Sequence, residues 1–542
     1  MSNLRRNLDH LATLLFEAGV THWVVSPGSR NAPIVASFIR HGGFKLFSFP
    51  DERAAAFAAL GISQSNLYPA GVICTSGTAA INLYPAVCEA FYQRTPLIVL
   101  TADRPTELID QWDGQTIHQE NLFQPHCLSF QNIEGNSIDL ISLEKTIFQS
   151  VQTSIFPIAG PTHINVSLKD PIYEGLDLPF FNEPIQKPFI FVHDNPKPID
   201  QNEVLRIIAP DVNPIPNKIL CLVGQHAPSE PLEQALRLLQ HKIPVLTDIC
   251  SHQTTLGIQQ WDLAMLSQEI NDDLVPELLI TVGMGSISKP LKLFLKQHKP
   301  RHIHICENGH VGDPFETMPE IFNFHDADFL TALYLTLAEN TTYLNHWQSF
   351  TKGANTLKFN DLYLTEFKFV QEILNQVDDT YILHLGNSMS IRYASWVGGS
   401  KAQIYCNRGT SGIDGSLSTA VGFAMACPEK QHLCILGDIS FIYDSHGMWT
   451  GNFPKNLSII VLNNGGGQIF NWIDGPKKES RLKPLIETPQ NYQLSELCSF
   501  YQISHSKVNQ QNTFNEIMEL IQSNIQCIEF TNHDSIKFDI IT

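Results

Sequence analysis

Two short stretches, Gly-Asp-Ile-Ser at 437–440 and Asn-Asn-Gly-Gly-Gly-Gln at 463–468, carry the strongest signal in this chain. Each follows an apolar run of strand length, at 433–436 and 457–462. In open parallel sheets, ligands bind at the carboxyl ends of the strands. A carboxylate, an amide oxygen and a backbone carbonyl suit Mg²⁺, and glycines let the backbone approach a diphosphate. Asp and Gly are also ordinary turn residues, so only the two stretches together predict a site for Mg²⁺ and a diphosphate.

The first third of the chain alternates apolar runs with helical patterns. We predict strands at 23–25, 46–49, 71–74 and 97–100, helices over 3–18 and from Ala54, and another helix opened by residues 75–80. Such alternation is typical of a doubly wound parallel sheet. The turns after these strands read Ser-Pro-Gly-Ser-Arg at 26–30, Asp-Glu-Arg at 51–53, Cys-Thr-Ser-Gly-Thr-Ala-Ala at 74–80 and Thr-Ala-Asp-Arg-Pro at 101–105. Taken alone, Arg30 is a loop charge, and Glu52 is an acid that stabilises a helix N-terminus.

Two further regions repeat this alternation. Strands at 219–224, 245–246, 278–283 and 302–306 and a helix over 231–240 predict a central domain, in which we find no convincing GxGxxG motif. Strands at 381–385 and 404–406 and helices over 367–376, 418–426 and 443–450 predict a third. The fold class is therefore α/β, with three doubly wound parallel-sheet domains. We expect domains over 1–180, 201–345 and 355–542, with a Pro-rich linker over 181–200.

Composition narrows the class of protein. The chain has 542 residues, 43% of them hydrophobic, and a formal net charge of −19, which argues against a nucleic-acid or anionic-membrane partner. Its eleven cysteines form no CxxC pair, which favours reduced thiols in a cytoplasmic protein. Because we find neither a signal peptide nor an apolar run long enough to span a bilayer, we expect a cytoplasmic protein without membrane insertion.

Gly-Asp followed, after 24 intervening residues, by Asn-Asn resembles the diphosphate-anchoring motif of thiamine-diphosphate-dependent enzymes. Here Ile439 stands where the family often has Gly. The resemblance implies a divalent metal, Mg²⁺ or Mn²⁺, held by Asp438, Asn464 and the carbonyl of Gly466. It also implies an apolar wedge at Ile413 that bends the cofactor. The residues so assigned to the cofactor are Glu52, Ser388, Ile413, Gly437, Asp438, Ser440, Asn464 and Gly466.

The four turn motifs of the first third resemble one branch of this family, the synthases of menaquinone biosynthesis that join 2-oxoglutarate to isochorismate. The resemblance implies a transferase in which the Glu52 carboxyl bonds a ring nitrogen of the cofactor and promotes its activation. Such a carboxyl needs a poorly hydrated site that tunes its proton affinity. Glu52, Gln115, Arg392 and Arg408 are the catalytic residues implied.

The same resemblance assigns the substrate contacts. Guanidinium groups suit carboxylates, so Ser29, Arg30 and Arg104 are expected on isochorismate, and Arg392 and Arg408 on 2-oxoglutarate. The full substrate set is Ser29, Arg30, Arg104, Gln115, Lys289, Arg392, Arg408, Gln468, Ile469, Phe470 and Ile473. The chain departs from the branch at Gly114, where Asn is common, at Pro290, where Arg follows the Lys, and at His118, which we interpret as structural.

In this family the activating Glu and the diphosphate motif lie in different domains and meet between subunits. The resemblance therefore implies a homodimer or homotetramer, and residues 476–480 are a candidate closing loop. Two alternatives stay open. Gly114 and Pro290 leave room for a thiamine enzyme that joins a 2-oxo acid to a different acceptor. The second alternative is a non-catalytic binding protein of the same fold. The presence of Glu52, Asp438 and Asn464 argues against it.

Overall fold

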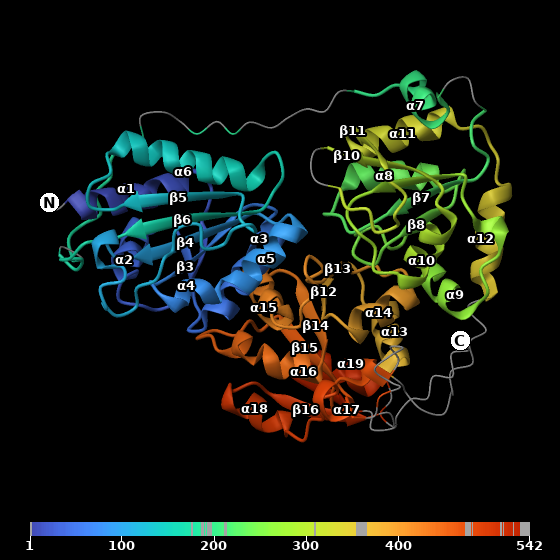
Figure 1. Ribbon diagram of the computed structural model, residues 1–542. Helices are drawn as coiled ribbons and strands as arrows, with labels where there is room; N and C mark the ends of the chain where they lie inside the picture. Colours follow the sequence, from blue (N-terminus) through green and yellow to red (C-terminus); the bar gives the residue numbers. More distant parts are fainter. Residues whose placement is uncertain are drawn as a thin grey trace.

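The structure is a computed structural model that contains three parallel sheets flanked by helices (Figure 1). It describes residues 3–174, 177–185, 189, 191, 198–210, 214–307, 311–353, 366–471, 479, 481–509, 512, 514–523 and 525–531. The sheet order along the chain confirms the predicted α/β class with three sheets. Each sheet lies inside one of the three predicted segments, and the limits of the domains stay a prediction.

The first sheet is six-stranded, in the order β2-β1-β3-β4-β6-β5. Its strands are β1 (His22–Val25), β2 (Lys45–Ser48), β3 (Ala70–Cys74), β4 (Leu97–Asp103), β5 (Ser129–Glu134) and β6 (Pro161–Ser167). One face packs on α1 (Asn3–Glu17), α2 (Ala32–His41) and α6 (Leu140–Ile155). The other packs on α3 (Glu52–Asn66), α4 (Thr78–Asn82) and α5 (Tyr84–Gln93), and a 3₁₀ turn, η1 (Thr106–Leu108), follows β4.

The central sheet is five-stranded, in the order β11-β10-β9-β7-β8. Its strands are β7 (Ile219–Val223), β8 (Val245–Thr247), β9 (Leu278–Val282), β10 (Arg301–Cys306) and β11 (Glu320–Asn323). One cluster of buried side chains joins it to α7 (Gln201–Ile208), α8 (Glu230–Leu239) and α11 (Asp326–Thr336). A second joins it to α9 (Trp261–Ser267), α10 (Lys289–His298) and α12 (Thr342–Lys352), with η3 (Asp272–Leu274) between α9 and β9.

The third sheet has the order β13-β12-β14-β15-β17-β16. Its strands are β12 (Tyr381–Leu385), β13 (Gln403–Tyr405), β14 (Gln431–Gly437), β15 (Leu457–Asn463), β16 (His505–Asn509) and β17 (Cys527–Thr531). Its helices are α13 (Glu366–Gln376), α14 (Met389–Val397), α15 (Ser416–Ala426), α16 (Asp438–Tyr443), α17 (Lys483–Ile486), α18 (Leu494–Phe500) and α19 (Phe514–Gln522), with 3₁₀ turns η5 (Ser445–Met448) and η6 (Gln468–Asn471). In chain order, this is the same permutation of strands as in the first sheet.

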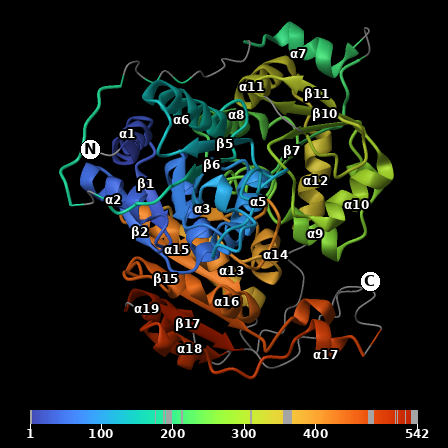
Figure 2. The ribbon, with the colours of Figure 1, turned by 60° about the vertical axis from the view of Figure 1, so that its left-hand side comes forward.

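Helices α3 and α15 join the first sheet to the third, and both views place them between the two sheets (Figures 1 and 2). A Cβ atom on Gly61 of α3 would overlap the carbonyl oxygen of Thr419 on α15. A Cβ atom on Gly422 of α15 would overlap the carbonyl oxygen of Ala58 on α3. The two backbones are thus in direct contact, which only glycine allows at these positions.

The structure corrects one predicted element. The helix predicted over 443–450 instead begins at Asp438, as α16, and is followed by the separate 3₁₀ turn η5. We interpreted Gly-Asp as a turn, but Gly437 has extended backbone angles and Asp438 is already the first helical residue. An acid at this position interacts favourably with the helix dipole, so the predicted cation ligand also starts a helix.

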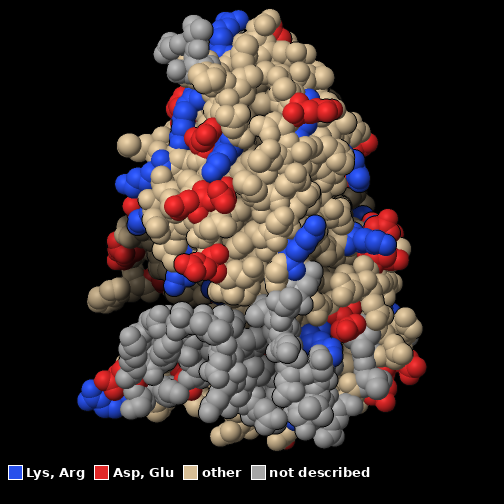
Figure 3. Space-filling model, turned by 90° about the vertical axis from the view of Figure 1, so that its right-hand side faces the viewer, with Lys and Arg blue, Asp and Glu red and all other residues tan. Residues whose placement is uncertain are grey.

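The face in Figure 3 shows basic and acidic side chains interspersed over its described part, with wide neutral areas between them. Within the described residues, no helix combines the length and the apolar character that a membrane span requires.

We expect Gly61→Ala to lower the apparent free energy of unfolding by about 1–3 kcal/mol, because the new methyl group forces α3 and α15 apart. Urea unfolding followed by fluorescence measures this. Gly285→Ala is the matched control, since no atom lies within 4 Å of the Cβ it adds. Equal unfolding midpoints for the two variants would contradict the proposed close packing.

Candidate active site

A cavity of about 180 Å³ lies at the carboxyl ends of the third sheet. The strand order reverses between β12 and β14, and ligands bind at such reversals in open α/β sheets. The cavity is lined by the turns after β12, β14 and β15 and by the loop before α15. It brings together ten predicted site residues: Ser388, Ile413, Gly437, Asp438, Ser440, Asn464, Gly466, Gln468, Ile469 and Phe470.

Among the described residues, two buried oxygens in this cavity have no hydrogen-bond partner, Oδ2 of Asp438 and Oδ1 of Asn464. Nδ2 of Asn464 donates to Oε1 of Glu366 (3.0 Å), which leaves the amide oxygen free. Unpaired buried acceptors are rare because they cost free energy, and a bound divalent cation removes that cost. The residues present therefore fit the implied metal, with the carbonyl of Gly466 as its third protein ligand.

Glu366 is a site residue that the sequence interpretation missed. It is fully buried at the start of α13, and its second oxygen accepts a hydrogen bond from the Tyr393 hydroxyl (3.0 Å). Burial raises the pKa of Glu366. Burial and the neighbouring Glu366 carboxyl raise the pKa of Asp438 to about 7. Glu366 thus orients the Asn464 amide and destabilises the Asp438 charge until a cation is bound.

The loop after β12 is strained and tied to the loop before α15. Ser388 has φ +74°, a conformation costly for a residue with a side chain. Nδ2 of Asn387 donates to the carbonyls of Asn407 and Gly412, both at 2.7 Å. The Ser440 hydroxyl donates to the Ile413 carbonyl (3.0 Å). These bonds hold Ile413 and the strained Ser388, which both line the cavity.

Arg392 and Arg408 are neighbours at the same end of the sheet. Nη1 of Arg392 donates to the Ser388 carbonyl (2.7 Å), and Nη1 of Arg408 donates to Oδ1 of Asn387 (2.8 Å). Burial and the charge of Arg408 lower the pKa of Arg392. Over the described residues, neither guanidinium makes a salt bridge with a carboxylate. Two close guanidinium groups that make no salt bridge within the described residues are suited to binding an anion.

Lysine 289 is exposed at the first residue of α10. One turn later, Lys292 is half-buried, and its pKa is lowered by burial and then by the charge of Arg408. The structure therefore places Lys292, which sequence interpretation missed, within electrostatic reach of Arg408. Asp262 accepts hydrogen bonds from Ser288, the N-cap of α10, and from Ser395 of α14 (2.6 Å), which holds the two helices together.

The remaining described site residues form a second set at the carboxyl ends of the first sheet. Nη1 of Arg30 donates to Oδ2 of Asp170 (3.2 Å), and Nε of Arg104 donates to Oδ2 of Asp113 (2.7 Å). Nη1 of Arg104 also donates to the Gln115 carbonyl (3.4 Å). Both acid partners are exposed, so a substrate carboxylate can replace them. Ser29 precedes Arg30 in the same loop, and its carbonyl accepts from the Tyr173 hydroxyl (3.2 Å).

Glu52 belongs to this second set and does not line the 180 Å³ cavity. It is the first residue of α3, directly after the N-cap Asp51. Burial raises the pKa of Glu52, and the charge of Asp51 adds to the effect. A carboxyl that keeps its proton nearer to neutral pH is suited to share it with a base. The predicted residue Ile473, and residues 476–478 and 480 of the candidate closing loop, lie outside the described residues.

Comparison with known proteins agrees with this geometry. Residues 6–125 match the N-terminal TPP binding domain of thiamine pyrophosphate enzymes, and residues 387–529 match the C-terminal TPP binding domain. The class is therefore that of the thiamine-diphosphate-dependent enzymes, as the motif at 437–440 and 463–468 predicted.

Curated relatives identify the branch. The chain is 34% identical to the 2-succinyl-5-enolpyruvyl-6-hydroxy-3-cyclohexene-1-carboxylate synthase of Flavobacterium johnsoniae, over 93% of this chain and 91% of the relative. It is 35% identical to the synthases of the same name from Cytophaga hutchinsonii, over 93% and 92%, and from Phocaeicola vulgatus, over 90% and 87%. The chain belongs to the 2-succinyl-5-enolpyruvyl-6-hydroxy-3-cyclohexene-1-carboxylate synthase family.

Because the Asp438 pKa is about 7 in the metal-free protein, the carboxyl is protonated below that pH. A cation must then displace a proton, so we expect the affinity for Mn²⁺ alone to fall about tenfold between pH 8 and pH 6. Electron paramagnetic resonance of free Mn²⁺ measures this without a titrating cofactor. The Asp438→Asn variant should bind Mn²⁺ weakly, and its affinity should not change with pH over this range. An unchanged affinity across this range in the unsubstituted protein would refute the assignment.

Proposed function

We propose that this protein is a transferase that decarboxylates 2-oxoglutarate and adds the resulting succinyl unit to isochorismate, giving 2-succinyl-5-enolpyruvyl-6-hydroxy-3-cyclohexene-1-carboxylate and carbon dioxide. The observation that carries the proposal is the cavity at Asp438, where two unpartnered oxygens lie at the same sheet end as the paired guanidiniums of Arg392 and Arg408. The identity of the product is supported by the names of the relatives, which are called synthases of this compound.

Thiamine diphosphate, when bound, supplies an electron sink for loss of carbon dioxide. The chain's own residues hold that cofactor and its divalent cation: Asp438, Asn464 and Gly466 at the cation, and Gly437, Ser440 and Ser388 at the diphosphate. Ile413 lies on the cavity wall beside them. Glu52 holds a proton at its carboxyl and shares it with the cofactor's ring, since burial favours its protonated form.

The substrates are anions in a protein of net charge −19, so local cations must reverse the field. Arg392 and Arg408 bind the carboxylates of 2-oxoglutarate, and Lys292 adds a third positive charge near them. Ser29, Arg30 and Arg104 bind isochorismate, with Gln115 beside Arg104 facing the reacting carbon. Gln468, Ile469 and Phe470 line the cavity, where the apolar side chains of Ile469 and Phe470 limit the access of water.

The proposal includes a homodimer or homotetramer in the cytoplasm. Support for shared sites comes from the division of the predicted residues, because Glu52 lies outside the cavity that contains Asp438. Two chains that exchange these halves complete both sites at once, as a two-fold symmetric interface permits.

The deciding experiment is mass spectrometry of the products. Purified protein with thiamine diphosphate, Mg²⁺, 2-oxoglutarate and isochorismate should form the succinylated cyclohexene product. A parallel sample without isochorismate should not. If 2-oxoglutarate loses carbon dioxide but nothing joins isochorismate, the acceptor is wrong, and Gly114 and Pro290 mark the change. If neither step occurs, the donor is wrong as well.

We expect Glu52→Gln to slow exchange of the proton at C2 of bound thiamine diphosphate by about 10²-fold or more, because the amide cannot share a proton in the same way. Nuclear magnetic resonance after acid quench measures the exchange. Glu107→Gln, at an exposed acid of the same domain, should leave it unchanged. Exchange at the unsubstituted rate in Glu52→Gln would exclude the role proposed for Glu52.

A further inference from the structure

The turn that carries Glu52 is held by residues of the third sheet's region. Oδ1 of Asp51 accepts the Ala54 N–H (3.1 Å) and so caps α3, while Oδ2 of Asp51 pairs with Nδ1 of His446 in η5. Burial alone would raise the pKa of Asp51, but the hydrogen bonds from His446 and the Ala54 N–H lower it. Asp51 is therefore a carboxylate with one oxygen in the first turn of α3 and the other on His446.

A second contact lies on the other side of Glu52. Nη2 of Arg53 donates to the Tyr443 carbonyl (2.8 Å), and the guanidinium lies 4.6 Å from the centre of the Tyr443 ring. Glu52 is thus flanked by two residues that each contact the segment 443–446.

The segment 443–446 is itself firmly placed. Asp444 is fully buried and accepts the N–H (2.7 Å) and the hydroxyl (2.6 Å) of Ser418 in the first turn of α15. The Asp444 N–H donates to the Ser440 carbonyl (3.0 Å). His446 is therefore attached to the frame that contains both α15 and the helix begun by Asp438, and it can serve as a fixed point for the Glu52 turn.

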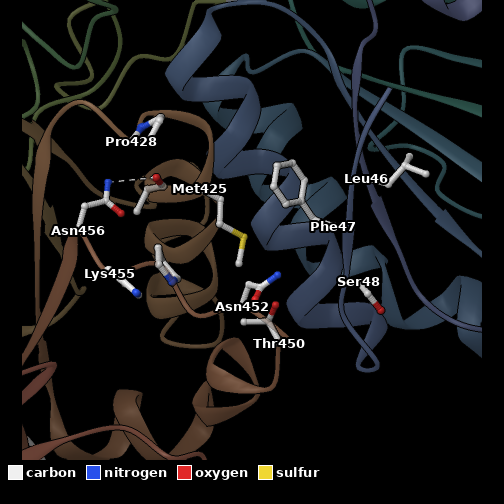
Figure 4. Close-up of a pocket in the computed structure, with 12 residues that line it drawn as sticks. Leu46, Phe47, Ser48, Met425, Pro428, Thr450, Asn452, Lys455 and Asn456 are labelled. Carbon is white, nitrogen blue, oxygen red and sulfur yellow. Dashed lines mark hydrogen bonds between the residues drawn. The ribbon is translucent and has the colours of Figure 1, made fainter. Parts of the chain in front are cut away.

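An open space lies beside the strand that precedes the Glu52 turn. A cavity of about 600 Å³ separates β2, which precedes the Glu52 turn, from residues 450–456, which follow η5. Figure 4 shows Leu46, Phe47 and Ser48 on one side of the gap and Thr450, Asn452 and Lys455 on the other. None of residues 49–53 is among those that line this cavity, so the polar contacts of Asp51 and Arg53 lie outside it.

We propose that His446 is a positioning residue for Glu52, acting through Asp51. As the first residue of α3, Glu52 takes its direction from the helix's first turn, which Asp51 caps and His446 anchors. A misplacement of about 1 Å in a reacting group can cost about 10²-fold in rate. This inference rests on the role proposed above for Glu52, and it concerns a residue that does not line the cavity at Asp438.

The test compares His446→Phe, which keeps ring volume beside Trp449 but loses the donor, with His446→Asn, whose amide nitrogen stands in for Nδ1. In the cofactor-free protein, hydrogen–deuterium exchange of peptides covering residues 50–57 should quicken at least about threefold in His446→Phe. C2 proton exchange of the bound cofactor should slow by about tenfold or more in the same variant. Both should stay within about twofold of the unsubstituted protein in His446→Asn.

Gln93→Leu is the matched control. Gln93 also makes one hydrogen bond from the first domain to the third, from Nε2 to the Cys406 carbonyl (3.0 Å), but far along the chain from Glu52. It should change neither readout. The proposal is overturned if His446→Phe matches the unsubstituted protein, or if Gln93→Leu produces the same loss. If Glu52→Gln leaves C2 exchange intact, the role of Glu52 fails instead; slow exchange in Glu52→Gln with normal exchange in His446→Phe rejects only the present inference.

Discussion

The direct contact between the backbones of α3 and α15 fixes the position of Glu52 relative to Asp438 within one chain. Gly61 and Gly422 leave no side chain between the helices, and small residues on both helices fill one shared core. Glu52 begins α3, and Asp444 holds the first turn of α15, six residues after Asp438. Movement of one helix against the other would therefore displace Glu52 relative to Asp438 of the same chain.

Electrostatics shows a site that is incomplete until its ligands are bound. Asp438 is a buried acid whose pKa is raised by burial and by the carboxyl of Glu366. Burial and the charge of Arg408 lower the pKa of the half-buried Arg392, and they likewise lower the pKa of Lys292. Each cluster is unfavourable alone, since like charges in a poorly hydrated site repel. In the proposed function, a divalent cation bound with a diphosphate neutralises the two acids, and a dicarboxylate neutralises the basic cluster.

The sequence alone predicts which residues of the candidate site lie together when they are close in the chain or follow adjacent strands. The oxygens of Asp438 and Asn464 follow adjacent strands, so the 24-residue spacing predicts their meeting. Glu366, 98 residues before Asn464, and His446, 395 residues after Asp51, belong to partners that only the tertiary fold selects. Lys292 was missed because its orientation depends on Asp262, which joins α10 to α14. Gly61 and Gly422 could be recognised only as small residues in helices, since contact between helices leaves no local pattern.

The shared strand permutation of the first and third sheets explains why one chain carries two half-sites. Equivalent turns follow equivalent strands, so Glu52 after β2 corresponds to the Arg408 loop after β13, and Ser76 after β3 corresponds to Asp438 after β14. Two sheets with the same strand order can face each other across an approximate two-fold axis. The carboxyl ends of the strands of one sheet then face those of the other. Within the described chain, Glu52 does not line the cavity that contains Asp438. In the proposed dimer, the partner subunit supplies the missing half. His446 then connects the two sites, because it holds the Glu52 turn of one site from the frame that carries Asp438 of the other.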